Sequence, residues 1–384
     1  MNVLMEGATL TDINKPTIRI KGLDGIRAVA VVMVLISHIV HQPGVSLGWL
    51  HGTIGDTIIR LLGRFGVFLF FVLSGYLITT LLCNEKEQSK RVDLRRFWIR
   101  RAFRIFPVFY AYLSVIAVIT AISILNLNPL AIIFAGTYTL NYSFILSNQP
   151  LGTDYPVVGH FWTLSVEEQF YLMFPLVISV LTTKAAFNAT LTLIVITPAT
   201  TVITYLAVPG SQHFTSIMGH NMFGVSIALG CLCVLAERCG KFKKFRKGLA
   251  NPFSASAGFF YGILIYPVIS RVFGGYGSTF GGEFLLGLSS LAVIIYAVEC
   301  STNSWFSKTL NHPWIVWFGR LSYSIYVWHQ LPLHFKIPFI APLVSNILLG
   351  IGSIGLAAFS YYFLEQPILR LRDHLQSRNA SGEF

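Results

Sequence analysis

Long apolar runs follow one another along almost the whole chain, and they limit what it can fold into. We recognise about eleven such runs, because a membrane-spanning helix needs about 20 predominantly apolar residues. They lie near residues 23–43, 63–83, 104–125, 131–146, 160–182, 187–207, 219–236, 251–269, 281–299, 313–334 and 343–365. Charged residues make up only 11% of the chain, whereas about 25% is usual in soluble domains. The sequence therefore predicts an all-α fold, a polytopic bundle of membrane-spanning helices.

Basic side chains indicate which of these runs cross the membrane. One basic segment covers residues 84–104 and a second covers 238–247, and the positive-inside rule puts both on the cytoplasmic side. This requires that the shortest run, 131–146, does not cross, since a crossing there would put the two segments on opposite sides. We therefore predict about ten transmembrane helices with both termini in the cytoplasm. Of the 28 Lys and Arg residues, those expected outside are Arg60, Arg64, Arg271 and Lys336.

The predicted organisation has a transmembrane domain at 23–365, a cytoplasmic segment at 1–22 and a cytoplasmic tail at 366–384 that is too short to fold alone. The first apolar run continues as a full span, so we expect no cleavable signal peptide. The net charge of +12 lies in short loops between apolar runs, which favours a lipid bilayer and excludes nucleic acid as a partner. The five cysteines match no zinc spacing, so the sequence predicts no metal site.

Two ionisable residues in the first run are functional candidates, because charges inside a membrane are costly. Arg27 and His38 share one helix face and lie about 16 Å apart along the axis. A cation near the cytoplasm would hold phosphates while a thioester reached the histidine. Histidine can take a proton from a hydroxyl and return it to a thiolate near neutral pH. A hydrogen-bonded core histidine is the alternative reading, and His41 is a competing candidate.

Two later segments add polar residues at helical spacing. Ser74 and Gly75 favour helix packing when they are considered alone. Arg101 and Arg104 share a helix face at the inner membrane surface. Paired guanidinium groups there would bind phosphate, of which coenzyme A carries three. The positive-inside rule also explains these arginines, because basic residues mark the cytoplasmic side of a membrane protein.

The run at 160–182 and the run at 313–334 contain the remaining candidates. Glu167 and Glu168 lie near the start of the first of these runs, where they would orient a histidine or bind sugar hydroxyls. Capping of a helix N-terminus explains them equally well. His329 ends a stretch that is rich in hydroxyl groups, so it either serves a site or stabilises a hydrogen-bonded helix.

Taken together, several sequence strings resemble the acyltransferase-3 family of membrane acyltransferases. They occur in the order found in that family and extend over nearly the whole chain. The strings are GLDGIRAVAVVMVLISH at 22–38, FLFFVLSGYLI at 68–78, RRFWIRRAFRIFP at 95–107, HFWTLSVEEQFYLMFP at 160–175, FGRLSYSIYVWHQ at 318–330 and FLEQP at 363–367.

The resemblance implies a ten-helix fold, an acyl-coenzyme A donor and an acceptor hydroxyl. It also implies that His38 is catalytic, that Arg27, Arg101 and Arg104 belong to the donor site, and that Glu168 and Tyr171 match the glutamate–tyrosine pair of the family. We add Glu167 and Glu168 as catalytic candidates. The candidate donor contacts are Ser74 and Tyr76, and the candidate acceptor contacts are His160, Tyr171 and His329.

These features predict a membrane O-acyltransferase that moves an acyl group from acyl-coenzyme A to a carbohydrate or glycosylated acceptor. Acetyl-coenzyme A is the expected donor, and the bacterial inner membrane is the expected location. Some members of the family carry an added hydrolase-like domain, and this chain resembles the stand-alone members. The alternative is a transporter of a hydrophobic or glycosylated compound, which would also explain intramembrane Arg and His. We find no internal repeat that would favour a transporter.

Overall fold

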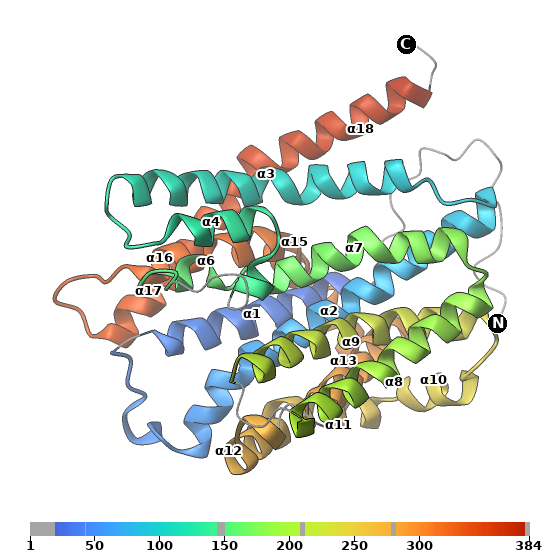
Figure 1. The fold of residues 1–384 in the computed structure, drawn as a ribbon, viewed down its shortest axis with the longest axis horizontal. Coiled ribbons are helices and arrows are strands. Elements are labelled where there is room, and N and C mark those ends of the chain that lie inside the picture. The colour runs from blue at the N-terminus through green and yellow to red at the C-terminus, as the bar shows by residue number, and fades with distance from the viewer. Residues whose placement is uncertain (1–19, 43, 144–149, 208–211, 278–281, 381–384) are drawn as a thin grey trace.

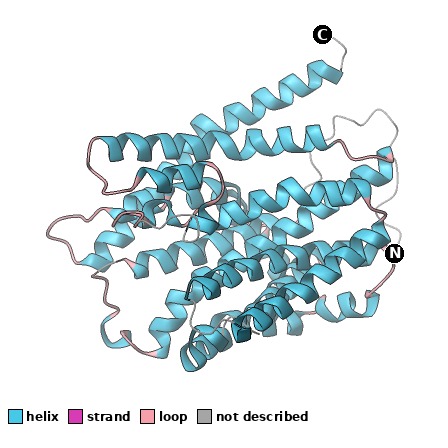
Figure 2. Ribbon diagram, in the orientation of Figure 1, coloured by secondary structure: helices cyan, strands magenta, loops and turns pink. Residues whose placement is uncertain are grey.

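The computed structural model describes residues 20–42, 44–143, 150–207, 212–277 and 282–380. Within these ranges every regular element is a helix, as Figure 2 shows. The predicted all-α class is therefore confirmed.

Long helices run back and forth between the two ends of an elongated bundle (Figure 1). In chain order, the long helices are α1 (Leu23–His41), α2 (Ile54–Ser89), α3 (Leu94–Ala121), α7 (Trp162–Val180), α8 (Thr183–Ala207), α9 (Gln212–Arg238), α11 (Pro252–Phe260) with its continuation α12 (Tyr266–Gly277), α13 (Glu283–Glu299), α15 (Pro313–Trp328) and α17 (Pro342–Ser360) with its continuation α18 (Gln366–Ala380). Two π-helical turns, η3 (Tyr261–Ile265) and η5 (Tyr361–Glu365), join the continued pairs.

Short helices connect these long ones. They are η1 (Gly48–Leu50), α4 (Pro129–Gly136), η2 (Leu140–Tyr142), α6 (Pro156–Gly159), α10 (Lys243–Leu249), α14 (Trp305–Leu310) and α16 (Gln330–His334). Helix α4 has 8 residues, so it is about 12 Å long and too short to cross a bilayer. The described part of the 131–146 run therefore forms no span, and residues 144–146 lie outside the described residues.

Five helices in the described part of the chain are both long and apolar enough to cross a membrane. They are Leu23–His41, Ile54–Ser89, Leu94–Ala121, Pro252–Val272 and Pro342–Leu375. Helices α13 and α15 run alongside them but have only 17 and 16 residues. The fold is that of a membrane helix bundle, while the total of ten crossings stays a prediction.

The two basic segments meet at one end of the bundle. Helix α2 ends there, α3 begins there, and α10 lies there, at the right of Figure 1. We call this the basic end, defined by residues 84–96 and 238–247. Helix α1 also begins at this end. The shared location of both basic segments agrees with their predicted placement on one side of the membrane.

Small residues allow the central helices to approach closely. A Cβ atom on Gly75 of α2 would lie 2.0 Å from the carbonyl oxygen of Ile227 in α9. The reciprocal contact is as tight, because a Cβ atom on Gly230 would lie 2.1 Å from the Val72 carbonyl oxygen. Lipid tails are as apolar as the side chains, so close packing of this kind drives helix association in membranes. The glycines therefore fix α2 against α9.

The first turn of α1 is anchored in the same way. Gly22 has φ +84° and donates its backbone N–H to the side chain of Asn311 at 3.0 Å. A Cβ atom on Gly25 would lie 2.4 Å from the Leu310 carbonyl oxygen. A Cβ atom on Gly319 of α15 would lie 1.9 Å from the Asp24 carbonyl oxygen. These contacts give a physical reason for the GLDGIR string, since they fix the turn that carries Arg27.

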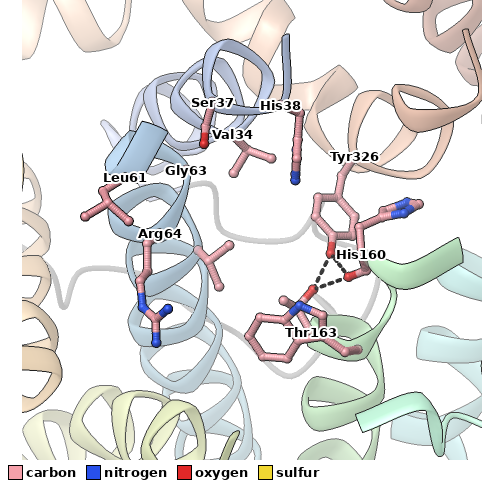
Figure 3. Close-up of a pocket in the computed structure, with 11 residues that line it drawn as sticks. Val34, Ser37, His38, Leu61, Gly63, Arg64, His160, Thr163 and Tyr326 are labelled. Carbon is pink, nitrogen blue, oxygen red and sulfur yellow. Dashed lines mark hydrogen bonds between the residues drawn. The ribbon is translucent and has the colours of Figure 1, made fainter. Parts of the chain in front are cut away.

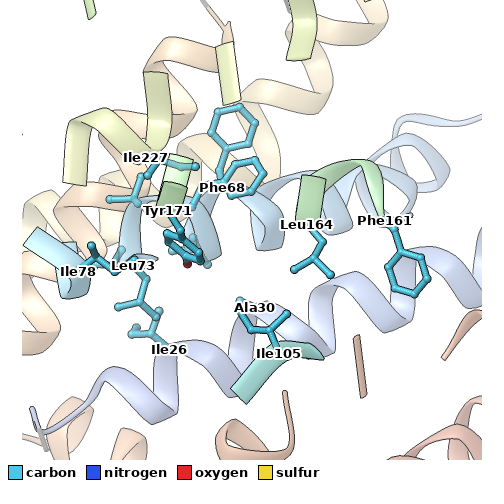
Figure 4. Packing of buried hydrophobic residues seen from close by; sticks show 14 of the residues in the cluster. Ile26, Ala30, Phe68, Leu73, Ile78, Ile105, Phe161, Leu164, Tyr171 and Ile227 are labelled. Atoms are coloured by element: carbon cyan, nitrogen blue, oxygen red, sulfur yellow. The ribbon is translucent and has the colours of Figure 1, made fainter. Parts of the chain in front are cut away.

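Buried apolar side chains from α1, α2, α3, α7 and α9 pack in the centre of the bundle (Figure 4). Ile26 and Phe68 are fully buried there, and Ile105 and Leu164 contribute from α3 and α7. The polar residues described next lie within this apolar packing, where an unpaired polar group is costly.

Candidate functional site

Two neighbouring cavities, both partly open to solvent, share part of their walls. One has about 790 Å³ of empty space and is lined by three arginines, so we call it the arginine cavity. The other has about 630 Å³ and is lined by His38 and His160, and we call it the histidine cavity. Since Arg27 is near the start of α1 and His38 near its end, the arginine cavity lies closer to the basic end.

Two helices supply the guanidinium groups of the arginine cavity. Arg27 comes from the second turn of α1, and Arg101 and Arg104 come from one face of α3. Arg27 also forms an ion pair with Asp24 at 3.5 Å. The group of three cations suits an anionic ligand with more than one phosphate, because guanidinium groups bind phosphate oxygens in pairs.

A hydrogen-bonded cluster forms another wall of the arginine cavity. The hydroxyl of Tyr171 in α7 donates to the Glu167 carboxylate and lies 2.9 Å from the Ser74 hydroxyl. Ser74 in α2 also donates to Glu167. The guanidinium carbon of Arg101 lies 4.2 Å from the centre of the Tyr171 ring. Tyr171 therefore holds Arg101 through a cation–π contact while its hydroxyl holds Glu167.

Ser74 and Gly75 are neighbours in the chain but act on different sides of α2. Ser74 lines the arginine cavity, whereas Gly75 packs on α9. Packing alone, which the sequence favoured for this pair, accounts for Gly75 and not for Ser74.

The histidine cavity contains the second group of candidates (Figure 3). His38 projects into it from α1, where Ser37 is its neighbour, and Arg64 of α2 lies on the side opposite Tyr326. Arg64 forms an ion pair with Glu283 of α13, a carboxylate that is 0% exposed. His160 lines the cavity and is 6% exposed.

His38 does not stand alone, because His329 lies directly behind it. Nε2 of His329 is 2.9 Å from Nδ1 of His38. The ring of His329 is 1% exposed, and its Nδ1 lies 2.8 Å from the carbonyl oxygen of Tyr326. The ring of His160 is also close, with its centroid 5.1 Å from that of His329. Three histidines from distant parts of the chain thus meet at one place.

The two cavities share three lining residues, Val67, Thr163 and Tyr326. The hydroxyls of Thr163 and Tyr326 hydrogen-bond to each other, and the Tyr326 hydroxyl also donates to the His160 carbonyl oxygen (Figure 3). We call these three residues the junction. A flexible ligand that binds the arginines and reaches His38 has to pass it.

The structure distributes the sequence candidates over three locations. The arginine cavity collects one group: Arg27, Ser74, Arg101, Arg104, Glu167 and Tyr171. The histidine cavity has His38 and His160 in its wall, with His329 behind His38. Tyr76 and Glu168 line neither cavity: Tyr76 is buried and Glu168 is half-buried. His41 contacts the Ser37 carbonyl oxygen at 2.8 Å and lines neither cavity.

Some lining residues were not singled out from the sequence. Tyr326 and Thr163 belong to strings that the family resemblance included, but no spacing rule indicated that their hydroxyls would meet. Arg64 was noted only as a basic residue outside the cytoplasmic segments. An arginine at the start of the apolar run 63–83 was the available signal for it, because charges next to lipid are costly.

A hydrogen bond between Ser324 and Glu365 gives a physical reason for the FLEQP string at 363–367. The Ser324 hydroxyl in α15 donates to the buried Glu365 carboxylate at 2.8 Å. Glu365 ends the π-helical turn η5, within the FLEQP string. This bond fixes the last long helix against α15, which supplies the junction tyrosine and His329.

Comparisons with known proteins identify the family of the chain. A family described as "Acyltransferase domain", of the acyltransferase-3 type, matches residues 20–365. The chain is 31% identical over 375 residues to the O-acetyltransferase OatA of Staphylococcus aureus, covering 90% of this chain and 57% of that protein. It is 27% identical over 366 residues to the putative peptidoglycan O-acetyltransferase YrhL of Bacillus subtilis, covering 91% of this chain and 55% of that protein.

The chain thus spans a little over half the length of these relatives. No solved structure matches it significantly.

Proposed function

Because the chain belongs to the acyltransferase-3 family, we propose that it is a membrane O-acyltransferase that moves an acetyl group from acetyl-coenzyme A to a hydroxyl of a carbohydrate. The observation that carries this proposal is the junction between the arginine cavity and the histidine cavity. A cationic site and a histidine line neighbouring cavities that have three wall residues in common. A transferase that uses a long, phosphate-bearing donor needs this combination.

The arginine cavity is the proposed donor site. Coenzyme A carries three phosphates, and Arg27, Arg101 and Arg104 offer three guanidinium groups to them. Arg27 and His38 are separated by about 16 Å along α1. That separation is on the order of the length of a pantetheine arm, so phosphates at the arginines leave the thioester beside His38.

His38 is the proposed catalytic base. It takes the proton from the acceptor hydroxyl, and the oxygen attacks the thioester carbonyl carbon. The carbon–sulfur bond then breaks, the acyl group stays on the acceptor oxygen, and the thiolate takes the proton from His38. The second route is attack by His38 itself, which would carry the acyl group before the acceptor receives it. Both routes need a neutral ring nitrogen that faces the histidine cavity.

The histidine cavity is the proposed acceptor site. One of the relatives is named as a putative peptidoglycan O-acetyltransferase, which makes a cell-wall or other surface polysaccharide the favoured acceptor. The cavity is lined by hydroxyl, imidazole and guanidinium groups as well as apolar side chains, a combination that suits sugar hydroxyls.

We place the basic end in the cytoplasm of a bacterial cell, with the bundle in the inner membrane. The positive-inside rule supports this orientation, because the two basic segments, residues 84–104 and 238–247, together carry 14 of the 28 Lys and Arg residues. Acetyl-coenzyme A is a cytoplasmic metabolite, so its site should open toward that side. The acceptor then reaches His38 from the other side.

The test is acetyl transfer by the purified full chain in detergent, with radiolabelled acetyl-coenzyme A and added sugar acceptors. We expect release or transfer of label by the wild type and a loss of about 10²-fold or more in His38→Ala. The matched control is His334→Ala, because His334 lies 3.6 Å from Asp154 and lines neither cavity. Thermal unfolding of each variant shows whether it is folded.

The outcome also separates the enzyme from a transporter. Binding of acetyl-coenzyme A without any His38-dependent turnover would count against the enzyme. Absence of both binding and turnover in folded protein would favour transport of a hydrophobic or glycosylated compound.

A further inference from the structure

The buried pair formed by His38 and His329 determines which nitrogen of His38 can act. His329 is 1% exposed at the end of α15. Its Nδ1 lies 2.8 Å from the Tyr326 carbonyl oxygen and 3.2 Å from the Ile325 carbonyl oxygen. A carbonyl oxygen can only accept a hydrogen bond, so Nδ1 carries the proton. In a neutral imidazole the other nitrogen, Nε2, is then an acceptor.

A hydrogen bond joins the rings of His329 and His38. Nε2 of His329 and Nδ1 of His38 are 2.9 Å apart, and one of the two must donate. Since Nε2 of His329 is the acceptor, Nδ1 of His38 carries the proton. The lone pair of His38 is therefore on Nε2. Figure 3 shows the far end of the His38 ring directed into the histidine cavity.

We propose that His329 is a positioning residue that holds His38 in the Nδ1–H form, so that Nε2 faces the histidine cavity as the base or nucleophile. This proposal rests on the function proposed above and deepens it. His329 lines neither cavity, so it acts through His38 and does not contact the acceptor.

The pair behaves like the orienting contact of a catalytic triad, with an imidazole in place of the carboxylate. When Nε2 of His38 takes a proton from the acceptor hydroxyl, both its nitrogens become donors. The Nδ1–H bond to His329 persists in that state, because the His329 Nε2 lone pair still accepts it. If His329 were lost, the two forms of His38 would be free to exchange, and part of the population would present an N–H to the cavity in place of the lone pair.

The main variants are His329→Leu and His329→Gln in the full chain. Leucine fills the space without an acceptor, whereas the side-chain oxygen of glutamine can accept from Nδ1–H of His38. We expect the kcat of His329→Leu to fall by about 10²-fold, with the Kd for acetyl-coenzyme A within twofold of wild type. We expect the kcat of His329→Gln to be at least tenfold higher than that of His329→Leu. A purely structural role would give no such recovery, or would change donor binding as well.

The direct readout is nitrogen NMR of protein labelled with ¹⁵N-histidine. The lone-pair nitrogen of a neutral imidazole resonates far from the N–H nitrogen, and the His38 signals are assigned by their loss in His38→Ala. We expect wild-type His38 to have its lone pair on Nε2 and His329→Leu to show a mixture. His334→Gln is the matched control and should change neither the His38 signals nor kcat.

Three results would overturn the proposal: a wild-type lone pair on Nδ1, an unchanged kcat in His329→Leu, or an equal loss in folded Leu and Gln variants. The NMR result does not depend on turnover. If the wild type transfers no acyl group, the proposed function fails, while the tautomer of His38 is still measured independently.

Discussion

The hydroxyls of Thr163 and Tyr326 hydrogen-bond to each other at the place where the arginine cavity meets the histidine cavity. Thr163 belongs to the first turn of α7 and Tyr326 to the last turn of α15. Their bond joins two helices that are far apart in the chain. Val67 of α2 completes the junction, so its size is set by three side chains from three helices.

The first prediction concerns the length of the acyl group. The reacting thioester has to reach His38 past the junction, so the space beside Val67 limits the acyl chain. Val67→Ala should raise the ratio of butyryl to acetyl transfer, measured as kcat/KM, by about fourfold for each methylene it admits, since a buried methylene contributes about 0.8 kcal/mol.

The matched control is Val72→Ala, on the same helix. Val72 is 0% exposed and lines neither cavity, and its carbonyl oxygen packs against Gly230 of α9. This variant should lose stability without a change in acyl preference. An equal shift of preference in both variants would mean that Val67 has no special position.

The second prediction concerns donor affinity. Arg101→Ala and Arg104→Ala should each raise the KM for acetyl-coenzyme A by about tenfold or more, because a hydrogen bond to a charged group contributes about 1.5–3 kcal/mol. The control is Arg95→Ala, since Arg95 is exposed on the same helix. Steady-state kinetics at two salt concentrations measure the effect. A loss of the same size in Arg95→Ala would point to general surface charge and not to a site.

The third prediction separates the ring of Tyr171 from its hydroxyl. Tyr171→Phe keeps an aromatic face for Arg101 but removes the donor to Glu167. It should lower the free energy of unfolding by ~1–3 kcal/mol, with little change in the KM for acetyl-coenzyme A. Tyr171→Leu removes both contacts, and should raise that KM by about fivefold as the cation–π contact is lost. Thermal unfolding and initial-rate measurements on the two variants give the result. Equal KM values for Tyr171→Phe and Tyr171→Leu would show that the cation–π contact does not contribute to donor binding.

The fourth prediction tests the anchoring of α1. A Cβ atom on Gly25 would lie 2.4 Å from the Leu310 carbonyl oxygen, and the backbone there cannot move aside cheaply. Gly25→Ala should therefore destabilise the protein by about 1–3 kcal/mol, the usual cost of overpacking. Gly352→Ala is the comparison within a helix, because nothing lies within 4 Å of its added Cβ atom. Its unfolding temperature should equal or exceed that of wild type, and a similar loss in both variants would contradict the anchoring role.

Much of the architecture could be predicted from the sequence because lipid imposes simple rules. Apolar length predicts a helix, and the positions of the cations predict which helix ends lie together. Helix α4 illustrates this point, since charge placement alone suggested that the 131–146 run does not cross. Periodicity also predicted that Arg27 and His38 share a face, and both do line the paired cavities.

Contacts between helices could not be predicted in this way. The bond between His38 and His329 joins residues that are 291 positions apart, and no spacing rule within one helix indicates it. The same applies to Glu167 and Ser74, from α7 and α2. Such contacts depend on the rotation of each helix about its axis, which is set by close approaches such as that of Gly75 to Ile227.

The anchored first turn of α1 has a consequence for which sequence changes the chain can tolerate. Arg27 and His38 lie on one uninterrupted helix. The angle between their side chains about the helix axis is therefore set by the number of residues between them. A single residue inserted between them would rotate His38 by about 100° and shift it by about 1.5 Å. Its ring would then leave the cavity and lose His329, although every original side chain would still be present. Substitutions within this spacer that conserve volume should be tolerated, whereas insertions and deletions should not.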